Sequence, residues 1–158
     1  MKKFIYTTLS ASLIFVSLPA LAEKLVVYSR AQTVSHVDVG DKGSSHGDIV
    51  LRTGSLHLEE SGPSVGKFYS KAMIQSVDAD NKSDVRHITA ESVLPKGSIY
   101  IMDFVVVDMA EVISGSGHKH TGIIIGGTGK YSGVRGTYEF YLDIEDAVKG
   151  KFVYHIIR

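Results

Sequence analysis

Short runs of strand-forming residues, separated by turn clusters, place the strongest constraint on how this chain folds. The runs come at fairly even spacing, no long stretch has helical periodicity, and 16 glycines contribute to the turns. This pattern is typical of a β-sandwich or a β-barrel. We expect strands over residues 25–31, 48–58, 65–77, 85–94, 98–108, 120–125, 133–144 and 151–157.

The short connections decide how these strands pair. Neighbouring strands joined by tight turns must be antiparallel, because parallel pairs need long crossovers. Eight strands can close into a barrel whose interior holds side chains or one small ligand, and closure leaves no exposed sheet edge. We therefore predict an all-β fold, an eight-stranded antiparallel closed β-barrel.

The first residues have the pattern of an export signal. Lys2 and Lys3 precede a mostly apolar run, Pro19 interrupts that run, and residues 20–22 read Ala-Leu-Ala. This order matches a signal peptide with a small-x-small cleavage site, and the apolar run is short for a membrane span. We expect a signal peptide over 1–22 and a single barrel domain over 23–158, in a secreted or periplasmic protein. The alternative is an uncleaved anchor.

Composition narrows the function classes further. The chain has no cysteine, which excludes disulfides, a cysteine nucleophile and thiolate metal ligands, so the fold must rely on burial. It has 17 basic and 17 acidic residues, and the balance stays close to neutral when Lys2 and Lys3 leave with the leader. Neither nucleic acid nor an anionic membrane surface is an expected partner.

The fifth predicted strand is apolar on both faces. Ile101 and Val105 lie on one face, and Phe104 and Val106 lie on the other. A strand of this kind is buried on both sides, so a second subunit is expected to cover the outer one. An outer-membrane barrel is the competing interpretation. Too many charged residues interrupt the other strands for a lipid-facing band, so we do not expect the mature chain to be embedded in a membrane.

Two segments resemble a known family. Residues 126–136 read GGTGKYSGVRG, which is similar to the glycine-rich signature of dirigent proteins and of allene oxide cyclase-like barrels. Residues 45–50 read SHGDIV, which resembles the segment that opens the second strand in allene oxide cyclase-like proteins. The order of the parts agrees over nearly the whole mature chain. Positive φ angles in the turn and bends at a barrel corner are a purely structural reason for the glycines.

The resemblance to the allene oxide cyclase and dirigent superfamily carries several expectations. It implies a calycin-like barrel, a homo-oligomer that is often a trimer, and a small apolar ligand inside the barrel. Members of this superfamily steer the cyclisation or coupling of reactive intermediates without a metal or an organic cofactor. Two departures put a dirigent-type mechanism in doubt: the loop over 109–119 is long, and Ser29-Arg30 stands where dirigents place an aspartate.

Two residues are candidates for catalysis. Arg135 matches the cavity arginine that follows the glycine motif in dirigents, where its donor fork could hold negative charge; the alternative is a surface arginine on the polar face of its strand. Asp103 interrupts the apolar face of the fifth strand, and in the interior it would be a general acid or base. The alternatives for Asp103 are a structural ion pair or a bulge that turns it outward.

Six further residues are candidates for ligand binding, each beside a structural alternative. The phenols of Tyr28, Tyr141 and Tyr154 could line the pocket, although ordinary core packing is the more common role for such residues. Asp48 either caps the turn before the second strand or lies at the barrel mouth. Arg52 and Glu91 interrupt apolar runs, which solvent-facing positions of alternating strands also explain.

Two other motifs do not support a function. Gly43 to Gly47 fits the G-x-S-x-G pattern, but a strand-like run follows it, whereas a nucleophile elbow leads into a helix. His118 and His120 form an H-x-H pair, and no spacing indicates a third ligand, so no metal site is predicted.

Three functions therefore remain open. The first is a cofactor-independent cyclase or isomerase that holds an apolar substrate in a dry cavity. The second is a lipocalin-like carrier without catalysis, and the third is a secreted interaction protein. Clustered polar groups in the cavity would favour the cyclase or isomerase. A uniformly apolar interior would favour the carrier, and a cavity filled by the protein's own side chains would favour the interaction protein.

Overall fold

A computed structural model describes residues 22–40, 42–80, 82–108, 110, 119–143, 146 and 148–158. The proposed leader therefore lies outside the described residues, apart from Ala22, and so does most of the loop over 109–119. The strands are β1 (Ala22–Val37), β2 (Ile49–His57), β3 (Ser64–Val77), β4 (Ser83–Leu94), β5 (Gly97–Asp108), β6 (Lys119–Gly127), β7 (Arg135–Leu142) and β8 (Lys149–Ile157). One 3₁₀ turn, η1 (Gly129–Tyr131), follows β6.

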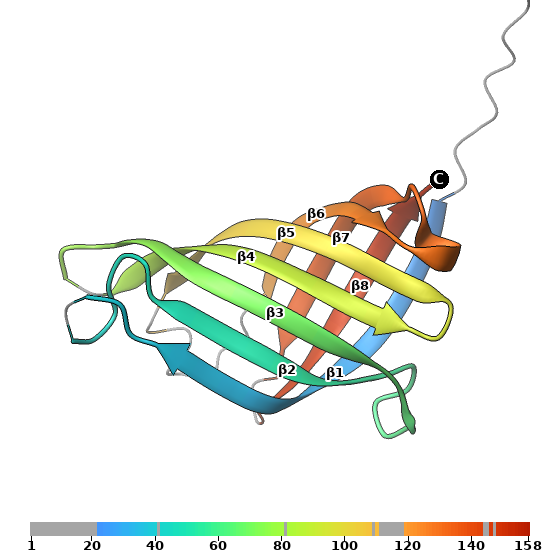
Figure 1. Ribbon diagram of the computed structural model, residues 1–158, viewed down its shortest axis with the longest axis horizontal. Helices are drawn as coiled ribbons and strands as arrows, with labels where there is room; N and C mark the ends of the chain where they lie inside the picture. Colours follow the sequence, from blue (N-terminus) through green and yellow to red (C-terminus); the bar gives the residue numbers. More distant parts are fainter. Residues whose placement is uncertain are drawn as a thin grey trace, which may run out of the picture.

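The strands form one closed barrel, as predicted. Each strand pairs antiparallel with the next in sequence, and β8 closes the barrel on β1 (Figure 1). The expected strand positions agree with the observed ones except at β1, which continues past residue 31 to Val37. The continuation is mostly polar and exposed, and its two valines, Val34 and Val37, do not alternate with polar residues. It still pairs with β2 beyond a register shift between Ala31 and Thr33.

Side chains alternate between the inside and the outside of the barrel, and β5 shows this most clearly. Ile99, Ile101, Val105 and Val107 are buried inside, as their shared face predicted. Phe104 and Val106 point outward, and each is 65% exposed. Both faces of β5 are therefore apolar, but in the single chain only the inner face is covered.

One half of the barrel is filled by a hydrophobic core. Leu56, Ile99, Ile124, Tyr154 and Ile156 are essentially inaccessible and belong to one cluster that draws on most of the strands. Toward the other half, a series of aromatic rings continues the core, with Phe152 at its centre: the Phe152 ring stacks on Tyr154 at 5.8 Å and contacts Phe140 at 4.7 Å. These rings form the base of the open interior described below.

The glycine-rich segment makes the sharp corner between β6 and β7. Gly129 has φ +56° and opens η1, and a Cβ there would lie 2.4 Å from the carbonyl oxygen of Lys96. Thr128 holds the corner to β5, because its backbone N–H donates to Ser98 O and its hydroxyl accepts from Ser98 N. The structural reason for this motif is thus visible in the backbone.

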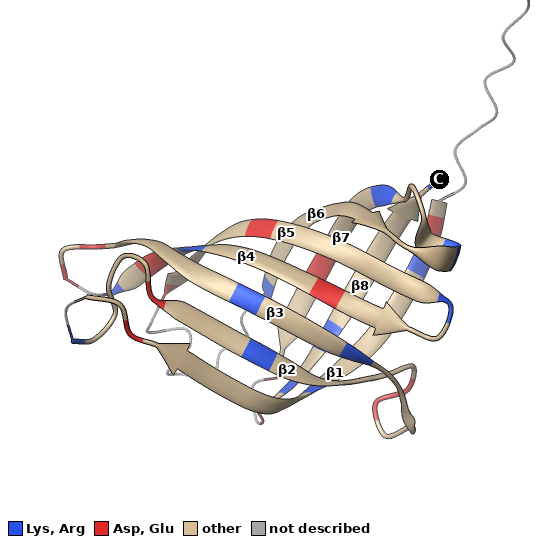
Figure 2. Cartoon of the chain, viewed as in Figure 1, with Lys and Arg blue, Asp and Glu red and all other residues tan. Residues whose placement is uncertain are grey.

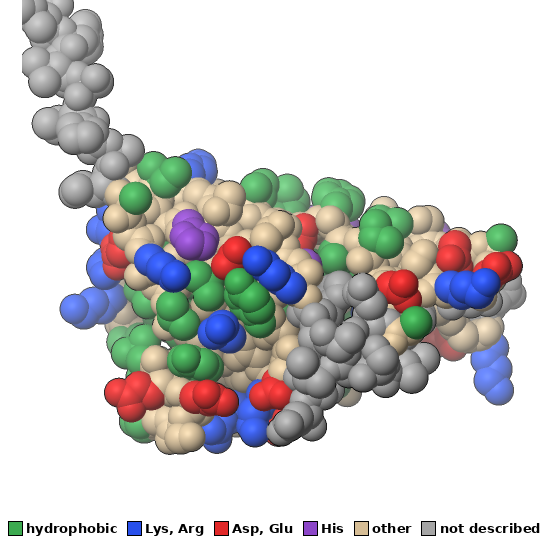
Figure 3. Space-filling view, turned by 180° about the vertical axis from the view of Figure 1, so that it is seen from behind, with side chains coloured by type: hydrophobic (Ala, Val, Ile, Leu, Met, Phe, Trp, Pro, Cys, Tyr) green, Lys and Arg blue, Asp and Glu red, His purple; other side chains and the backbone are tan. Residues whose placement is uncertain are grey.

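Charged residues of both signs are interspersed along the strands and hairpin ends (Figure 2). The opposite side of the molecule likewise mixes acidic, basic and hydrophobic side chains (Figure 3). Within the described ranges, no helix has the length and apolar character needed to cross a membrane.

Candidate functional site

The barrel encloses a cavity of about 140 Å³ on the side of the core where β1 ends and β2 begins. A cavity of about 150 Å³ holds a benzene molecule, so this space accepts a group of that size. Most of the lining is apolar. Side chains from all eight strands contribute: Ser29, Ala31, Val50, Arg52, Phe68, Ser70, Ala72, Arg86, Ile88, Ala90, Ile101, Val105, Val107, His120, Tyr138, Phe140, Leu142, Lys149 and Phe152, with Val148 from the turn before β8.

A polar cluster interrupts this apolar wall. His120 of β6 lies opposite Phe140 of β7 in the strand register, and its side chain lines the cavity. Behind it, Asp103 Oδ2 lies 2.5 Å from His120 Nδ1 and accepts a hydrogen bond of 3.3 Å from the Tyr138 hydroxyl. The side chains of Asp103 and His120 are only 6% and 10% exposed, so water screens this pair weakly.

Strand pairing explains how these three residues meet. Asp103 faces inward because it shares the parity of Ile101 and Val105 on β5. Gly122 of β6 makes the close approach possible: a Cβ at this position would lie 2.6 Å from the Tyr138 ring and 2.9 Å from Asp103 Cβ. The glycine therefore leaves the space in which the carboxylate reaches both the imidazole and the phenol.

Tyr138 acts as a fixed hydrogen-bond donor in this cluster. Burial, followed by the negative charge of Asp103, raises the pKa of the Tyr138 phenol far above its ordinary value. The phenol therefore keeps its proton at every physiological pH. Asp103 thus has two neighbours that hold it in place, and both of them, His120 and Tyr138, line the cavity.

The chemistry of this arrangement follows from the Nδ1 contact. A carboxylate oxygen and a ring nitrogen at 2.5 Å must share a proton, since two acceptors would repel each other. The hydrogen bond fixes the orientation of the imidazole and supports positive charge on it. An imidazole held in this way in an apolar cavity can take a proton from a bound molecule and return it.

Two arginines lie on the same inner surface. Arg86 of β4 makes a bidentate pair with Asp84, with distances of 2.6 Å from Nε to Oδ1 and 2.8 Å from Nη2 to Oδ2. Arg52 of β2 also faces the cavity. Burial, and secondly the charge of Arg86, lowers the pKa of the Arg52 guanidinium.

The structure places the two predicted catalytic residues differently. Asp103 is interior and buried, with His120 between it and the cavity, so it is in a position to orient the imidazole. Arg135 lies exposed on the outer surface at the start of β7, where its Nη1 donates to the carbonyl of Val134 at 2.8 Å. The structure does not bring Arg135 to the cavity or to Asp103.

Two of the six ligand-binding candidates, Arg52 and Tyr154, face the interior. Tyr154 is fully buried in the core and hydrogen-bonded to Ser92 at 2.6 Å, below the cavity. Asp48 caps the turn before β2: it accepts hydrogen bonds from the backbone N–H groups of Val39 and Ser45, both at 2.7 Å.

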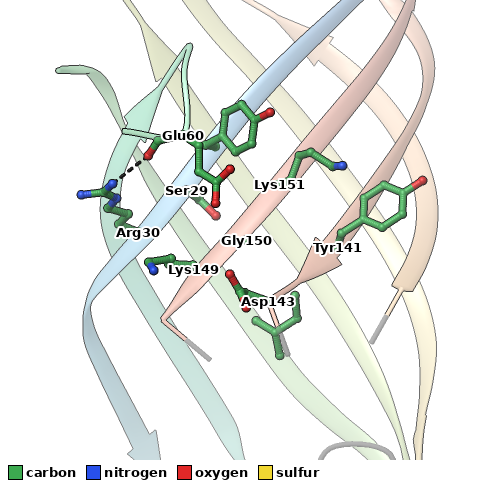
Figure 4. A pocket seen from close by; sticks show the side chains of 10 residues that line it. Ser29, Arg30, Glu60, Tyr141, Asp143, Lys149, Gly150 and Lys151 are labelled. Carbon is green, nitrogen blue, oxygen red and sulfur yellow. Dashed lines mark hydrogen bonds between the residues drawn. The ribbon is translucent and has the colours of Figure 1, made fainter. Parts of the chain in front are cut away.

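The other three candidates point outward. Glu91 lies on the outer face of β4, paired across the strands with Tyr69 and Tyr100. Tyr28 and Tyr141 line a separate surface pocket of about 200 Å³ (Figure 4).

This surface pocket is polar and lies outside the barrel wall, between β1, β7, β8 and the turn after β2. In Figure 4, Arg30 reaches the backbone carbonyl of Glu60 at 2.7 Å, and Lys151 points toward Tyr141. The Lys151 ammonium lies 4.7 Å from the centre of the Tyr141 ring. Arg30 and Lys151 thus contact a backbone carbonyl and an aromatic ring, respectively.

Sequence reasoning did not identify His120 and Tyr138 as members of an acid–base cluster. His120 was considered only as part of an H-x-H pair; His118 lies outside the described residues, and no group of metal-ligating side chains occurs in the described part. One signal was available, because His120, Gly122 and Ile124 alternate with the outward residues of β6. Which of these faces points inward follows only from the pairing with β5 and β7.

Comparison with known proteins establishes the fold. No protein-family model matches the chain, and no curated protein matches it in sequence. A pyocyanin demethylase is 18% identical with a TM-score of 0.69, covering 85% of this chain and 99% of that chain. An exo-specific intermolecular Diels-Alderase is 15% identical with a TM-score of 0.62, covering 87% and 99%.

A third similar structure is a pterocarpan synthase dirigent protein. It is 16% identical with a TM-score of 0.61, and the similarity covers 97% of each chain. At these identities the likeness concerns the fold: the chain has the allene oxide cyclase-like barrel that dirigent proteins and Diels-Alderases share.

Proposed function

We propose that this protein binds a small, largely apolar molecule in its barrel and catalyses an isomerisation or cyclisation of it by proton transfer, without a cofactor. His120 is the group that exchanges a proton with the bound molecule. Asp103 orients the imidazole and balances the charge it gains, and Tyr138 holds the carboxylate. The observation that carries the proposal is the buried Asp103–His120 contact at the wall of an apolar cavity.

The cavity supports an enzyme over a simple carrier. A carrier of apolar molecules needs only an apolar wall, and burying polar groups in it costs free energy unless they are paired. Here a paired carboxylate, imidazole and phenol occupy one side of the wall. Structural neighbours named a demethylase, a Diels-Alderase and a pterocarpan synthase support the same choice, because all three names describe chemistry on small organic molecules.

The proposal also covers where and in what form the protein works. The leader over 1–22 supports export, so the site of action is the periplasm or the outside of the cell. The exposed outer side chains of Phe104, Val106, Ile123 and Ile125 support a homo-oligomer that covers β5 and β6, with a trimer as the favoured form.

Native mass spectrometry of the purified protein, followed by denaturation and extraction, identifies the bound molecule. That compound is then incubated with fresh protein in D₂O and followed by NMR. We expect conversion to an isomer that is heavier than the substrate by the deuterium it has taken up, with the label at the carbon that receives the proton. Deuterium incorporation reports the proton transfer directly.

His120→Asn is the decisive variant, because an asparagine amide can still donate to Asp103 while the distal ring nitrogen is lost. Lys71→Gln, on the exposed outer face of β3, is the matched control. Loss of conversion in His120→Asn alone supports the proposal. A ligand that wild-type protein binds and never alters supports the carrier instead, and equal conversion by His120→Asn overturns the role of the imidazole.

A further inference from the structure

Among the residues that the structure describes, the charged ones that line the cavity all have the same sign. Of the described lining residues, Arg52, Arg86 and Lys149 are basic and none is acidic, although Lys149 also lines the surface pocket outside the wall. The chain as a whole has equal numbers of basic and acidic residues, so composition does not explain this selection. An enclosed wall with one sign of charge favours a ligand of the opposite sign.

Partners are available for two of these three cations. Arg86 holds Asp84, whose side chain is 1% exposed and whose two oxygens are both used. The Lys149 ammonium lies 3.3 Å from an Asp146 carboxylate oxygen, and both side chains are partly exposed. For Arg52, no hydrogen bond or ion pair joins the guanidinium to another residue in the described part of the chain.

An unpaired guanidinium inside a barrel is costly. Its burial removes water from a permanent charge, and the neighbouring Arg86 adds repulsion, as the lowered pKa of Arg52 reflects. An outward position or an apolar residue would avoid both costs. A group kept in such a position serves a purpose outside the folding of the chain itself.

We propose that Arg52 is the anchor for an anionic group of the ligand, and that the cavity takes a small carboxylate with an apolar body about the size of one ring. The guanidinium fork matches a carboxylate in shape and charge. Arg86 lies on the same inner face and adds positive potential. With the carboxylate at Arg52, the apolar body lies toward Phe152, Tyr138 and His120.

This inference rests on the proposed function only in taking the barrel cavity as the ligand site, and it does not require catalysis. It assigns the preference for an anionic ligand to Arg52, and the proton-transfer roles of Asp103, His120 and Tyr138 are not needed for that preference. Binding of a simple probe therefore tests it separately from any turnover.

The test uses sodium benzoate and its neutral analogue benzyl alcohol, with binding to the full chain measured by titration calorimetry. We expect wild-type protein to bind benzoate at least about tenfold more tightly, in line with a charge-assisted hydrogen bond to a half-buried guanidinium. Arg52→Met should remove this preference while leaving benzyl alcohol binding unchanged. Arg52→Lys should keep part of it, because the charge remains and the fork is lost. Lys71→Gln should behave as wild type.

The melting temperature without probe gives an independent readout. Removing an unpaired, half-buried charge should leave Arg52→Met as stable as wild type or more stable, whereas removal of a structural arginine would lower its melting temperature by several degrees. That fall would overturn the inference, as would equal binding of the two probes by wild type or a benzoate preference that survives in Arg52→Met. If neither probe binds, the cavity is not a ligand site, and the proposed function fails with the inference.

Discussion

Asp103 is the residue around which the proposed chemistry is built, although it does not line the cavity. Its carboxylate is held by Tyr138 on one side and contacts His120 on the other, so the imidazole has a fixed orientation before any ligand arrives. A site that is organised in advance does not spend binding energy on arranging its groups. In this arrangement Asp103 acts through His120, as a positioning residue.

Asp103→Asn should therefore lower kcat much more than it changes KM. The amide has nearly the same shape, but it neither fixes the tautomer of His120 nor balances its charge, so we expect kcat on the identified substrate to fall by about 10²- to 10⁴-fold. KM should stay within about twofold, because the carboxylate does not face the cavity. Asp108→Asn, at the exposed end of the same strand, is the control. A rise in KM with kcat unchanged would contradict a positioning role.

Asp48 gives a prediction about pH and stability. Hydrogen bonds from the backbone N–H groups of Val39 and Ser45 lower the pKa of its carboxyl below the ordinary value of 3.8. A group with a lowered folded pKa adds stability above its unfolded pKa, and this contribution is lost as the pH falls through the folded pKa. Wild-type protein should therefore lose urea resistance more steeply than Asp48→Asn below about pH 4. Parallel curves for the two proteins would show that the cap adds no stability.

Single residues show where sequence reasoning succeeds and where it stops. Asp103 could be selected because a carboxylate within an apolar alternation is conspicuous without any structure. Whether Arg135 faces the cavity or solvent could not be predicted, because its orientation depends on the number of residues in the corner between β6 and β7. Arg52 has the same ambiguity, which the register with Ser70 on β3 resolves in favour of the interior.

At the scale of strands and turns, the positions of eight strands could be predicted because turn clusters separate them. The second half of β1 was the exception. It is stabilised by its pairing with β2 more than by burial, and the pattern of apolar residues in a sequence carries no information on backbone pairing. The close approach of β1 and β2 beside their register shift also lacks an apolar signal: a Cβ on Gly54 would lie 1.9 Å from the carbonyl oxygen of Arg30. Only the three-dimensional pairing explains that glycine.

Substitutions at two glycines near the start of β7 allow the cost of backbone strain to be measured apart from the cost of a steric clash. Gly133 has φ +75° with no atom within 4 Å of an added Cβ, so Gly133→Ala should cost about 1–2 kcal/mol from its left-handed backbone alone. Gly136 has φ +142°, and its Cβ would lie 1.9 Å from the carbonyl oxygen of His155 on β8. Gly136→Ala should therefore cost on the order of 3 kcal/mol or more. Urea unfolding of both variants measures the difference, and equal losses would contradict the steric argument.

At the scale of the whole molecule, one half of the barrel interior holds the hydrophobic core that stabilises the fold, and the other half holds the candidate site. The filled half carries the core, and closure of β8 on β1 satisfies the backbone groups that an open sheet would expose. A chain without cysteine has no covalent crosslink to compensate for an empty interior. The cavity is correspondingly small, and the polar cluster lies at its boundary with the aromatic rings of the core.

The outer face of β5 and β6 carries apolar side chains that the described part of the single chain leaves exposed. Phe104 and Val106 are each 65% exposed, and Ile123 and Ile125 of the neighbouring strand are 48% and 42% exposed. His87 stacks on Phe104 at 4.7 Å, so this aromatic side chain has a defined position on the surface. Four large apolar side chains on adjacent strands form a patch of the kind that subunit interfaces cover.

Phe104→Lys should convert the proposed oligomer to monomers, because a charge at the centre of an apolar interface is left without water or a partner. Light scattering coupled to size exclusion measures the mass directly. Leu58→Lys is the matched control, since Leu58 is 55% exposed in the turn after β2, away from this patch. We expect the control to keep the wild-type mass. The monomeric variant should retain benzoate binding, because the cavity is lined by one chain; a wild-type monomer would instead rule out an oligomer built on this face.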